Sequence, residues 1–420
     1  MSSVATELGR IRSSPLARNA GWMLAGQGAN LILQMGCFVL LGRLLGSVQY
    51  GIFVGAFAFT SLLATFSAMG SGTLLLRYVS TKTGAFAAYW GNVLLTTTVF
   101  STVLLAAAKI VAPHLLNPSS AALVLLAGIS NCFFNELTRN AAAVFQAHER
   151  MRTTAALNLA TNLVRLIGAA SMLLLLGHAT AFQWASVSVV VSGMATIASL
   201  VCVTRRYGKP ALSLRLLFAG IPEGFGYSFA SSTASVYNDI DKTMLSHYGL
   251  NAQNGIYALA YRMIDMAALP VLAVRDAAVP RFFREGTNNR RELWKLTFRL
   301  TKRSLVVSGL LGAGLYVGSA LIPLLVGESF RDSAQAVRWL CLIPMLRCVH
   351  QMTGSAVMGL GLQKYRTVTQ MVVAGFNFVL NLWWIPAYGW KGAAGSSLLS
   401  DAMLAVLNTI VLAWLCKEHA

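Results

Sequence analysis

Charged side chains recur inside long apolar stretches of this sequence, where an ionisable group is costly unless it faces a partner or water. Glu136 and Arg139 stand three residues apart on one predicted helix, and Arg262 and Asp265 stand three apart on another, so each pair can meet on a helix face. Side chains of this kind suit either the binding of a charged ligand or a structural ion pair between helices. The pairs leave these two interpretations equally open.

A cation without an acidic residue within one helical turn is a better candidate for holding an anionic ligand, and Arg165, Arg338 and Arg347 meet that description. His350 can carry a proton at physiological pH, although a buried neutral histidine is the commoner case. The predicted cavity cations are Arg139, Arg165, Lys242, Arg262, Arg338 and Arg347. The residues predicted to pair with them or to take a coupling ion are Glu136, Asp239, Asp241, Asp265, Asp401 and His350.

Long uncharged stretches define the elements that must position these residues. Of the 420 residues, 56% are hydrophobic and 11% are charged, against about 25% charged residues in soluble domains. No charged residue lies between Arg18 and Arg43 or between Arg303 and Glu328. A membrane-spanning helix needs about 20 mostly apolar residues, and lipid offers no partner to a free backbone group. The stretches therefore predict transmembrane helices and an all-α integral membrane protein.

We predict twelve transmembrane helices, joined by short connections rich in glycine and proline. Their approximate limits are 20–42, 50–72, 86–112, 119–146, 154–177, 180–203, 224–248, 253–279, 304–327, 334–360, 366–386 and 390–415. Pro270 and Pro344 interrupt two of them and are predicted hinges. The stretch 281–303 is basic and amphipathic, and we expect it to lie along the cytoplasmic lipid surface. Polar stripes such as Asn377 and Asn381 should turn toward a shared water-filled cavity.

The basic residues sort by side of the predicted membrane. With the N-terminus inside, 22 Lys and Arg residues lie on the inner side and 4 on the outer side. Because cytoplasmic loops carry the excess of Lys and Arg, we expect both termini in the cytoplasm. The asymmetry accounts for most of the net charge of +19 and makes nucleic-acid binding a much poorer explanation of the basicity. The first apolar run exceeds the length of a signal-peptide core, so we expect no cleavable signal.

The two halves of the chain share a short repeat. Residues 51–57 read G-I-F-V-G-A-F and residues 255–261 read G-I-Y-A-L-A-Y, an offset of 204. Six predicted helices separate the copies, so both halves have the same orientation, as in parallel transporter repeats. We therefore predict one six-helix bundle at 1–203, a cytoplasmic linker at 204–223 and a second six-helix bundle at 224–420, around a central cavity.

Three segments resemble the polysaccharide-export branch of the multidrug/oligosaccharidyl-lipid/polysaccharide superfamily, the Wzx-type flippases of O-antigen and exopolysaccharide. They are 40–53 (L-L-G-R-L-L-G-S-V-Q-Y-G-I-F), 241–261 (with D-K-T-M-L and G-I-Y-A-L-A-Y) and 385–395 (I-P-A-Y-G-W-K-G-A-A-G). The resemblance implies a MATE-like fold whose cavity opens alternately to each side of the bacterial inner membrane. It also implies a polyprenyl-pyrophosphate-linked oligosaccharide as substrate and coupling to an ion gradient, of protons or sodium.

We therefore expect a flippase that acts with membrane lipid, a lipid-linked oligosaccharide and the polysaccharide polymerase and chain-length machinery. A small-molecule or drug cation antiporter of the same superfamily is the first alternative, and a membrane enzyme such as a polymerase or ligase is the second. No Gly-x-Ser-x-Gly motif, metal triad or phosphate-cradling loop stands at a predicted membrane face. The six cysteines form no Cys-x-x-Cys pair. We predict no enzymatic activity, no metal and no cofactor.

Overall fold

The computed structural model describes residues 15–81 and 84–417, and every regular element in these residues is a helix. The predicted all-α fold is confirmed. The physical reason is the length of the apolar runs, which satisfy their own backbone groups only as helices. Side chains as large as Leu174, Val317 and Trp383 are 86%, 76% and 74% exposed, as lipid-facing residues are. The chain is therefore a multi-pass membrane protein.

The chain divides into two compact units. Unit 1 comprises Met1–Leu45 and Ala56–Ser232, and unit 2 comprises Gly46–Gly55 and Thr233–Ala420. The residues predicted as a linker, 204–223, fall inside unit 1. Residues 51–55, which begin the first copy of the repeat, belong to unit 2.

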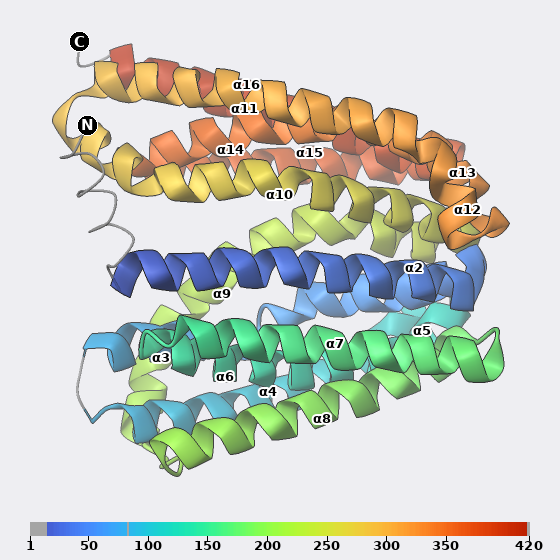
Figure 1. Ribbon diagram of the computed structural model, residues 1–420, viewed down its shortest axis with the longest axis horizontal. Coiled ribbons are helices and arrows are strands. Elements are labelled where there is room, and N and C mark those ends of the chain that lie inside the picture. The colour runs from blue at the N-terminus through green and yellow to red at the C-terminus, as the bar shows by residue number, and fades with distance from the viewer. Residues whose placement is uncertain (1–14, 82–83, 418–420) are drawn as a thin grey trace, which may run out of the picture. The chain divides into compact units, whose positions relative to one another are not determined.

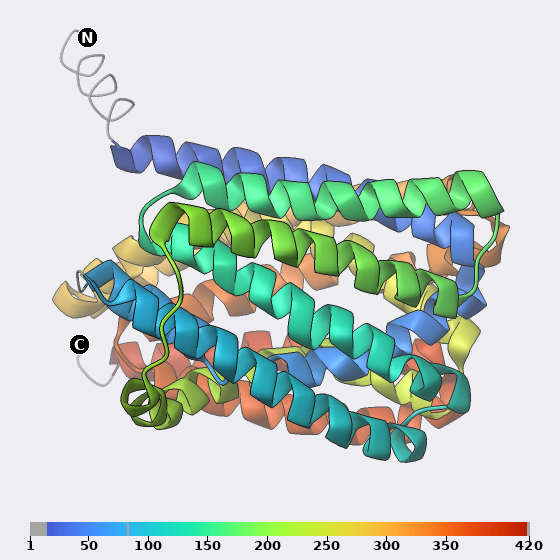
Figure 2. The ribbon, with the colours of Figure 1, turned by 90° about the horizontal axis from the view of Figure 1, so that it is seen from below.

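Unit 1 is a bundle in which α4, α6, α7 and α8 run alongside one another (Figures 1 and 2). Its elements are the two ends of α2 (Pro15–Ala64), without residues 46–55, then α3 (Ser71–Thr81), α4 (Phe86–Leu115), α5 (Pro118–Gly128), a π-helical stretch η1 (Ile129–Asn135), α6 (Glu136–Ala147), α7 (Met151–Leu176), α8 (Ala181–Tyr207) and the first part of α9 (Leu214–His247). Local sequence sets several of these ends. Asn117 caps α5 by accepting from the Ser120 amide at 3.0 Å, and Thr180 with Gln183 forms a capping box on α8.

The second predicted span breaks before its expected end at residue 72. The chain leaves α2 at Ala64 and re-enters a helix at Ser71, with Met69 and Gly70 in the left-handed region at φ 44° and 68°. Gly70 packs on the backbone of Gly224, and a methyl group at Gly70 would lie 2.1 Å from the Gly224 carbonyl oxygen. The break therefore depends on a glycine for both its conformation and its packing.

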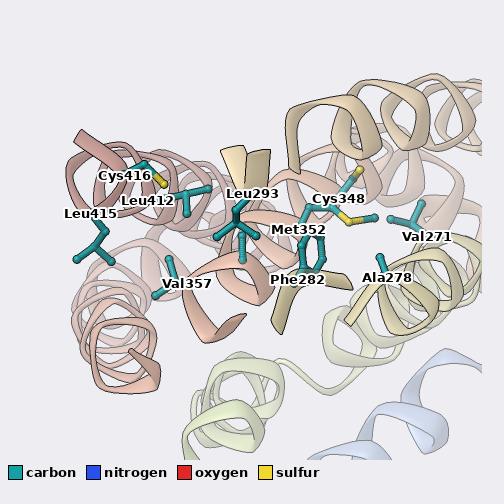
Figure 3. Close-up of a cluster of buried hydrophobic side chains, with 11 residues drawn as sticks. Val271, Ala278, Phe282, Leu293, Cys348, Met352, Val357, Leu412, Leu415 and Cys416 are labelled. Carbon is teal, nitrogen blue, oxygen red and sulfur yellow. The ribbon is translucent and has the colours of Figure 1, made fainter. Parts of the chain in front are cut away.

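Unit 2 is a bundle in which α10, α11, α14, α15 and α16 pack side by side (Figure 1). Its elements after α9 are α10 (Asn251–Asn288), α11 (Arg290–Gly318), the 3₁₀ turns η2 (Ser319–Leu321) and η3 (Glu328–Phe330), α12 (Ile322–Val326), α13 (Arg331–Leu340), α14 (Ile343–Gly359), α15 (Gln363–Tyr388) and α16 (Trp390–Lys417). One core cluster joins α10, α11, α14 and α16 through Phe282, Leu293, Met352 and Leu412, all fully buried (Figure 3).

The expectation that 281–303 lies on the lipid surface is wrong. Residues 281–288 form the end of α10, Asn289 caps α11 by accepting from the amides of Arg291 and Glu292, and residues 290–303 form the first turns of α11. Its apolar face packs on protein: Leu293 is fully buried, and Trp294 and Leu296 pack against the same core cluster. Amphipathic periodicity predicts a buried face but does not distinguish a protein partner from a lipid one.

Nine helices in the described residues are long and apolar enough to cross a membrane. The predicted span 20–42 and the part of the span 50–72 up to Ala64 lie in α2, whose two helical parts meet at a kink at Gly46 (φ 66°), and they count as one of the nine. The spans 224–248 and 334–360 are not among the nine, and the second is broken between α13 and α14. The count of twelve therefore stays a prediction.

Candidate functional site

A cavity of about 430 Å³ lies among the helices of unit 2. Its size is within the range of about 300–1,000 Å³ that is usual for small-ligand sites. Five helices line it: α9 with Tyr237, Asn238, Asp239 and Lys242; α10 with Arg262, Asp265, Leu269 and Leu272; α14 with Arg347, His350 and Gln351; α15 with Gln370; and α16 with Leu404. The spacing of three or four residues within α10 and α14 places each set on one helix face.

Arg347 is the centre of one charge cluster in this cavity. Its Nη1 donates to an Asp265 carboxylate oxygen at 2.5 Å, and its Nη2 donates to the Tyr261 hydroxyl at 2.8 Å. Its Nε lies 3.9 Å from a carboxylate oxygen of Asp401. The interpretation of Arg347 as a cation without an acidic neighbour therefore holds along its own helix but not in space, because its acids come from α10 and α16.

Asp401 is fully buried behind Arg347. One of its oxygens, Oδ1, accepts from the Tyr237 hydroxyl at 2.7 Å and lies 3.2 Å from Nε2 of His350. In the part of the chain that the structure describes, its Oδ2 has no hydrogen-bond donor. The contact places the His350 imidazole directly beside a buried carboxylate.

Lys242 is the centre of a second cluster. Its Nζ lies 3.1 Å from Asp239 and 3.9 Å from Asp241. Asp241 is buried, accepts from its neighbour's amide at 2.7 Å and also accepts from the Tyr257 hydroxyl. The Lys242 ammonium lies 4.8 Å from the centre of the Tyr261 ring, and the Arg347 guanidinium lies 5.1 Å from it. Tyr261 therefore contacts both cations through its ring.

The charges in the cavity nearly balance. The lining holds three permanent cations, Lys242, Arg262 and Arg347, and two carboxylates, Asp239 and Asp265. Asp241 and Asp401 stand directly behind it. Lys242 and Arg347 are thus held by carboxylates, and an anionic ligand has to compete with them.

The other predicted site residues lie elsewhere. Arg139 is on α6 of unit 1, largely exposed at 68%, and pairs with the buried Glu136 as expected. Arg165 is half-buried on α7 of unit 1. Arg338 is exposed on α13, donates to the Ser319 hydroxyl at 3.0 Å and is not among the residues that line the cavity. Within unit 2, the predicted cations that the fold gathers are Lys242, Arg262 and Arg347.

Two polar residues of α15, Asn377 and Asn381, do not line the cavity, and the expectation that they face it is wrong. Both are buried between α15 and α16. Asn377 donates to the Ser400 hydroxyl at 3.0 Å, and Asn381 donates to Asn377 at 2.9 Å and accepts from Ser396. In lipid such bonds hold helices together.

The predicted hinges take different positions. Pro270 lies inside α10. Pro344 lies in the first turn of α14, where a backbone amide has no hydrogen-bond partner within the helix, so proline costs no hydrogen bond there. Their movement stays a prediction.

Sequence reasoning missed the tyrosines of the site. Tyr257 and Tyr261 occupy the repeat positions that hold Phe53 and Phe57 in the first copy. Their hydroxyl groups are the ones that bind Asp241 and Arg347. The signal was therefore present: the second copy adds hydroxyls to the two aromatic positions of the repeat.

Exposed apolar helices around an internal charged cavity define a multi-pass membrane protein suited to handling a polar solute. The family model described as polysaccharide biosynthesis protein matches residues 16–285. This is more than half of the chain, and the protein belongs to that family. No curated protein sequence matches the chain.

Solved structures agree on the fold. The chain is similar to the lipid II flippase MurJ in an inward closed conformation, with a TM-score of 0.73 and 14% identity over 93% of this chain and 87% of that one. It is equally similar to an inward-facing multidrug resistance MATE family transporter of the MOP superfamily, with a TM-score of 0.73 and 14% identity over 93% and 96% of the two chains. An outward-facing MATE family transporter of the same superfamily gives a TM-score of 0.60, 12% identity and 97% coverage of both chains.

The predicted MATE-like fold is therefore confirmed, and the family match agrees with the resemblance to polysaccharide-export proteins. The similar solved structures are a flippase and transporters by their titles, which agrees with the prediction that the protein is not an enzyme.

Proposed function

We propose that the protein moves a polyprenyl-pyrophosphate-linked oligosaccharide across the bacterial inner membrane, for O-antigen or exopolysaccharide assembly. The observation that carries this proposal is the cavity in unit 2, where Lys242, Arg262 and Arg347 line one space inside a bundle of membrane-type helices. Cations inside a bundle of membrane-type helices suit a phosphate-bearing head group. The family description and the similarity to a lipid II flippase support a lipid-linked glycan substrate.

The proposed transport makes and breaks no covalent bond. The cavity residues bind the charged head, and the polyprenyl tail stays in the bilayer beside exposed apolar helices. In this proposal the cavity opens alternately to each side of the membrane, and this alternation moves the head across. In this proposal both termini are cytoplasmic, and the polymerase and chain-length machinery take up the product.

We propose that an ion gradient drives the cycle. Asp401 and His350 form a buried carboxylate–histidine contact of 3.2 Å beside the cavity, an arrangement used in proton relays. Asp239 and Asp241 are the alternative carboxylates for a sodium ion. Transport measured with a proton gradient alone and with a sodium gradient alone separates the two.

The decisive experiment uses proteoliposomes and a polyprenyl-pyrophosphate-linked sugar with a fluorescent label. The label should change leaflets while the mass of the lipid stays the same, and Arg347→Gln should stop the movement. The matched control is Arg331→Gln, because Arg331 is exposed at 77%, pairs with Glu328 and does not line the cavity. A changed mass of the lipid would indicate an enzyme, and transport of an organic cation without transport of the lipid would indicate an antiporter. A label that stays in its original leaflet would refute the proposal.

A further inference from the structure

The two carboxylates around Arg347 differ in their access to the cavity. The Asp265 side chain is 41% exposed and lines the cavity, whereas the Asp401 side chain is fully buried. The Arg347 side chain, 14% exposed, lies between them. One carboxylate can therefore leave Arg347 without crossing protein, and the other cannot.

The two carboxylates also differ in how firmly they are held. Asp401 has Tyr237 and His350 as further partners from α9 and α14. Asp265 accepts its hydrogen bond from Nη1 of Arg347, at 2.5 Å. The hydrogen bond of Asp265 joins α10 to α14, whereas moving Asp401 disturbs contacts that join α9, α14 and α16.

We propose that Asp265 is an exchangeable counter-ion, which a phosphate or pyrophosphate group displaces from Nη1 of Arg347 while Asp401 stays in place. This inference rests on the proposed function and specifies how the anionic part of the substrate is recognised. It also assigns Asp265 a role in specificity, because a ligand has to displace this carboxylate before it can bind Nη1 of Arg347.

The exchange is chemically reasonable because it replaces one charge-assisted pair with another. A guanidinium offers donors in a planar fork that matches phosphate oxygens in two places. The displaced Asp265 remains in a cavity that also holds Lys242 and Arg262. Neither partner is then left as an isolated charge, which would be expensive in a low-dielectric interior.

Exchange also provides selection. A neutral or cationic molecule cannot displace Asp265, and a monovalent anion such as chloride competes poorly with a carboxylate that is already in position. A multivalent phosphate ester competes better, since it brings more charge and two acceptor oxygens. Specificity here arises from a built-in competitor as well as from an attractive cation.

The test measures inorganic pyrophosphate binding to the full-length protein in detergent, followed by tryptophan fluorescence. Asp265→Asn removes the competitor and should tighten the Kd for pyrophosphate about tenfold, while Arg347→Gln should abolish binding. Asp265→Ser should behave like Asp265→Asn, and Asp265→Glu should keep the wild-type Kd. Asp276→Asn is the control, because Asp276 is on the same helix, pairs with Arg275 and does not line the cavity.

Two results would overturn the exchange: an Asp265→Asn or Asp265→Ser protein that binds pyrophosphate no more tightly than wild type, or binding that survives Arg347→Gln. Thermal unfolding of each variant shows whether it is folded, and the two neutral replacements guard against a local defect in one of them. The proposed function is tested separately by the leaflet assay. If Asp265→Asn binds pyrophosphate more tightly but the wild-type protein does not move the labelled lipid between leaflets, the exchange is upheld and the proposed flippase function is refuted.

Discussion

Gly51 and Gly255 pack backbone against backbone in unit 2, although 204 positions separate them in the chain. A methyl group at Gly51 would lie 1.8 Å from the Asn251 carbonyl oxygen, and one at Gly255 would lie 2.0 Å from the Ser47 carbonyl oxygen. Asn254 closes the contact by donating to the Gly51 carbonyl oxygen at 3.1 Å. The two copies of the repeat thus meet at their shared first residue, as small residues allow helices in membranes to do.

Gly51→Ala and Gly255→Ala should each lower the stability of the protein. Since each new methyl group meets backbone rather than a flexible side chain, we expect a loss of about 1–3 kcal/mol. Thermal unfolding in detergent measures it as a lower Tm. Gly375→Ala is the control, because Gly375 is also inside a helix of unit 2 and has no heavy atom within 4 Å of an added methyl. Equal Tm values for all three variants would contradict the packing argument.

Arg347→Gln should destabilise the fold as well as stop transport. It leaves the buried Asp401 without its cation, and breaking a buried pair from one side costs about 3–5 kcal/mol. Combining it with Asp401→Asn removes the orphaned charge and should recover part of the Tm while transport stays absent. A double variant no more stable than Arg347→Gln would show that the charge of Asp401 is not the source of the loss.

Tyr261→Phe separates the hydroxyl from the ring. The variant keeps the aromatic face under Lys242 and Arg347 but loses the 2.8 Å bond to Nη2 of Arg347. Loss of a hydrogen bond to a charged group costs about 1.5–3 kcal/mol, so transport should fall roughly tenfold or more. Tyr261→Leu, which removes the ring too, should fall further in the leaflet assay. If Phe and Leu behave alike, the ring contributes nothing to the site.

Asn381→Ala should affect stability and leave transport intact. Asn381 joins α15 to α16 rather than lining the cavity, and a bond of this kind within lipid contributes about 0.6–2 kcal/mol. We expect a lower Tm with normal leaflet exchange at a temperature where the variant is folded. Gln363→Ala, at the exposed start of α15, is the comparison. A transport defect in a fully folded Asn381→Ala protein would return this residue to the candidate site.

The sequence predicts contacts in the site only between residues that are close along the chain. The i, i+3 pair of Glu136 and Arg139 was predicted and is present, and Lys242 likewise meets Asp239 one turn away. The partners of Arg347 could not be predicted in this way, because Asp265 is 82 positions away and Asp401 lies on another helix again.

The sequence by itself determined that this protein is an all-helical, multi-pass membrane protein with ionisable groups among its helices. The physical reason is local: an apolar run about as long as a bilayer is thick has no other way to satisfy its backbone. Only the tertiary structure decided which faces meet. It buries Leu293 in a protein core and not in lipid, and it places Asn381 where its hydrogen bonds join α15 to α16. It also sets Asp265 and Asp401 on two sides of Arg347. Such outcomes depend on how each helix is rotated against its neighbours, and hydropathy carries no record of that rotation.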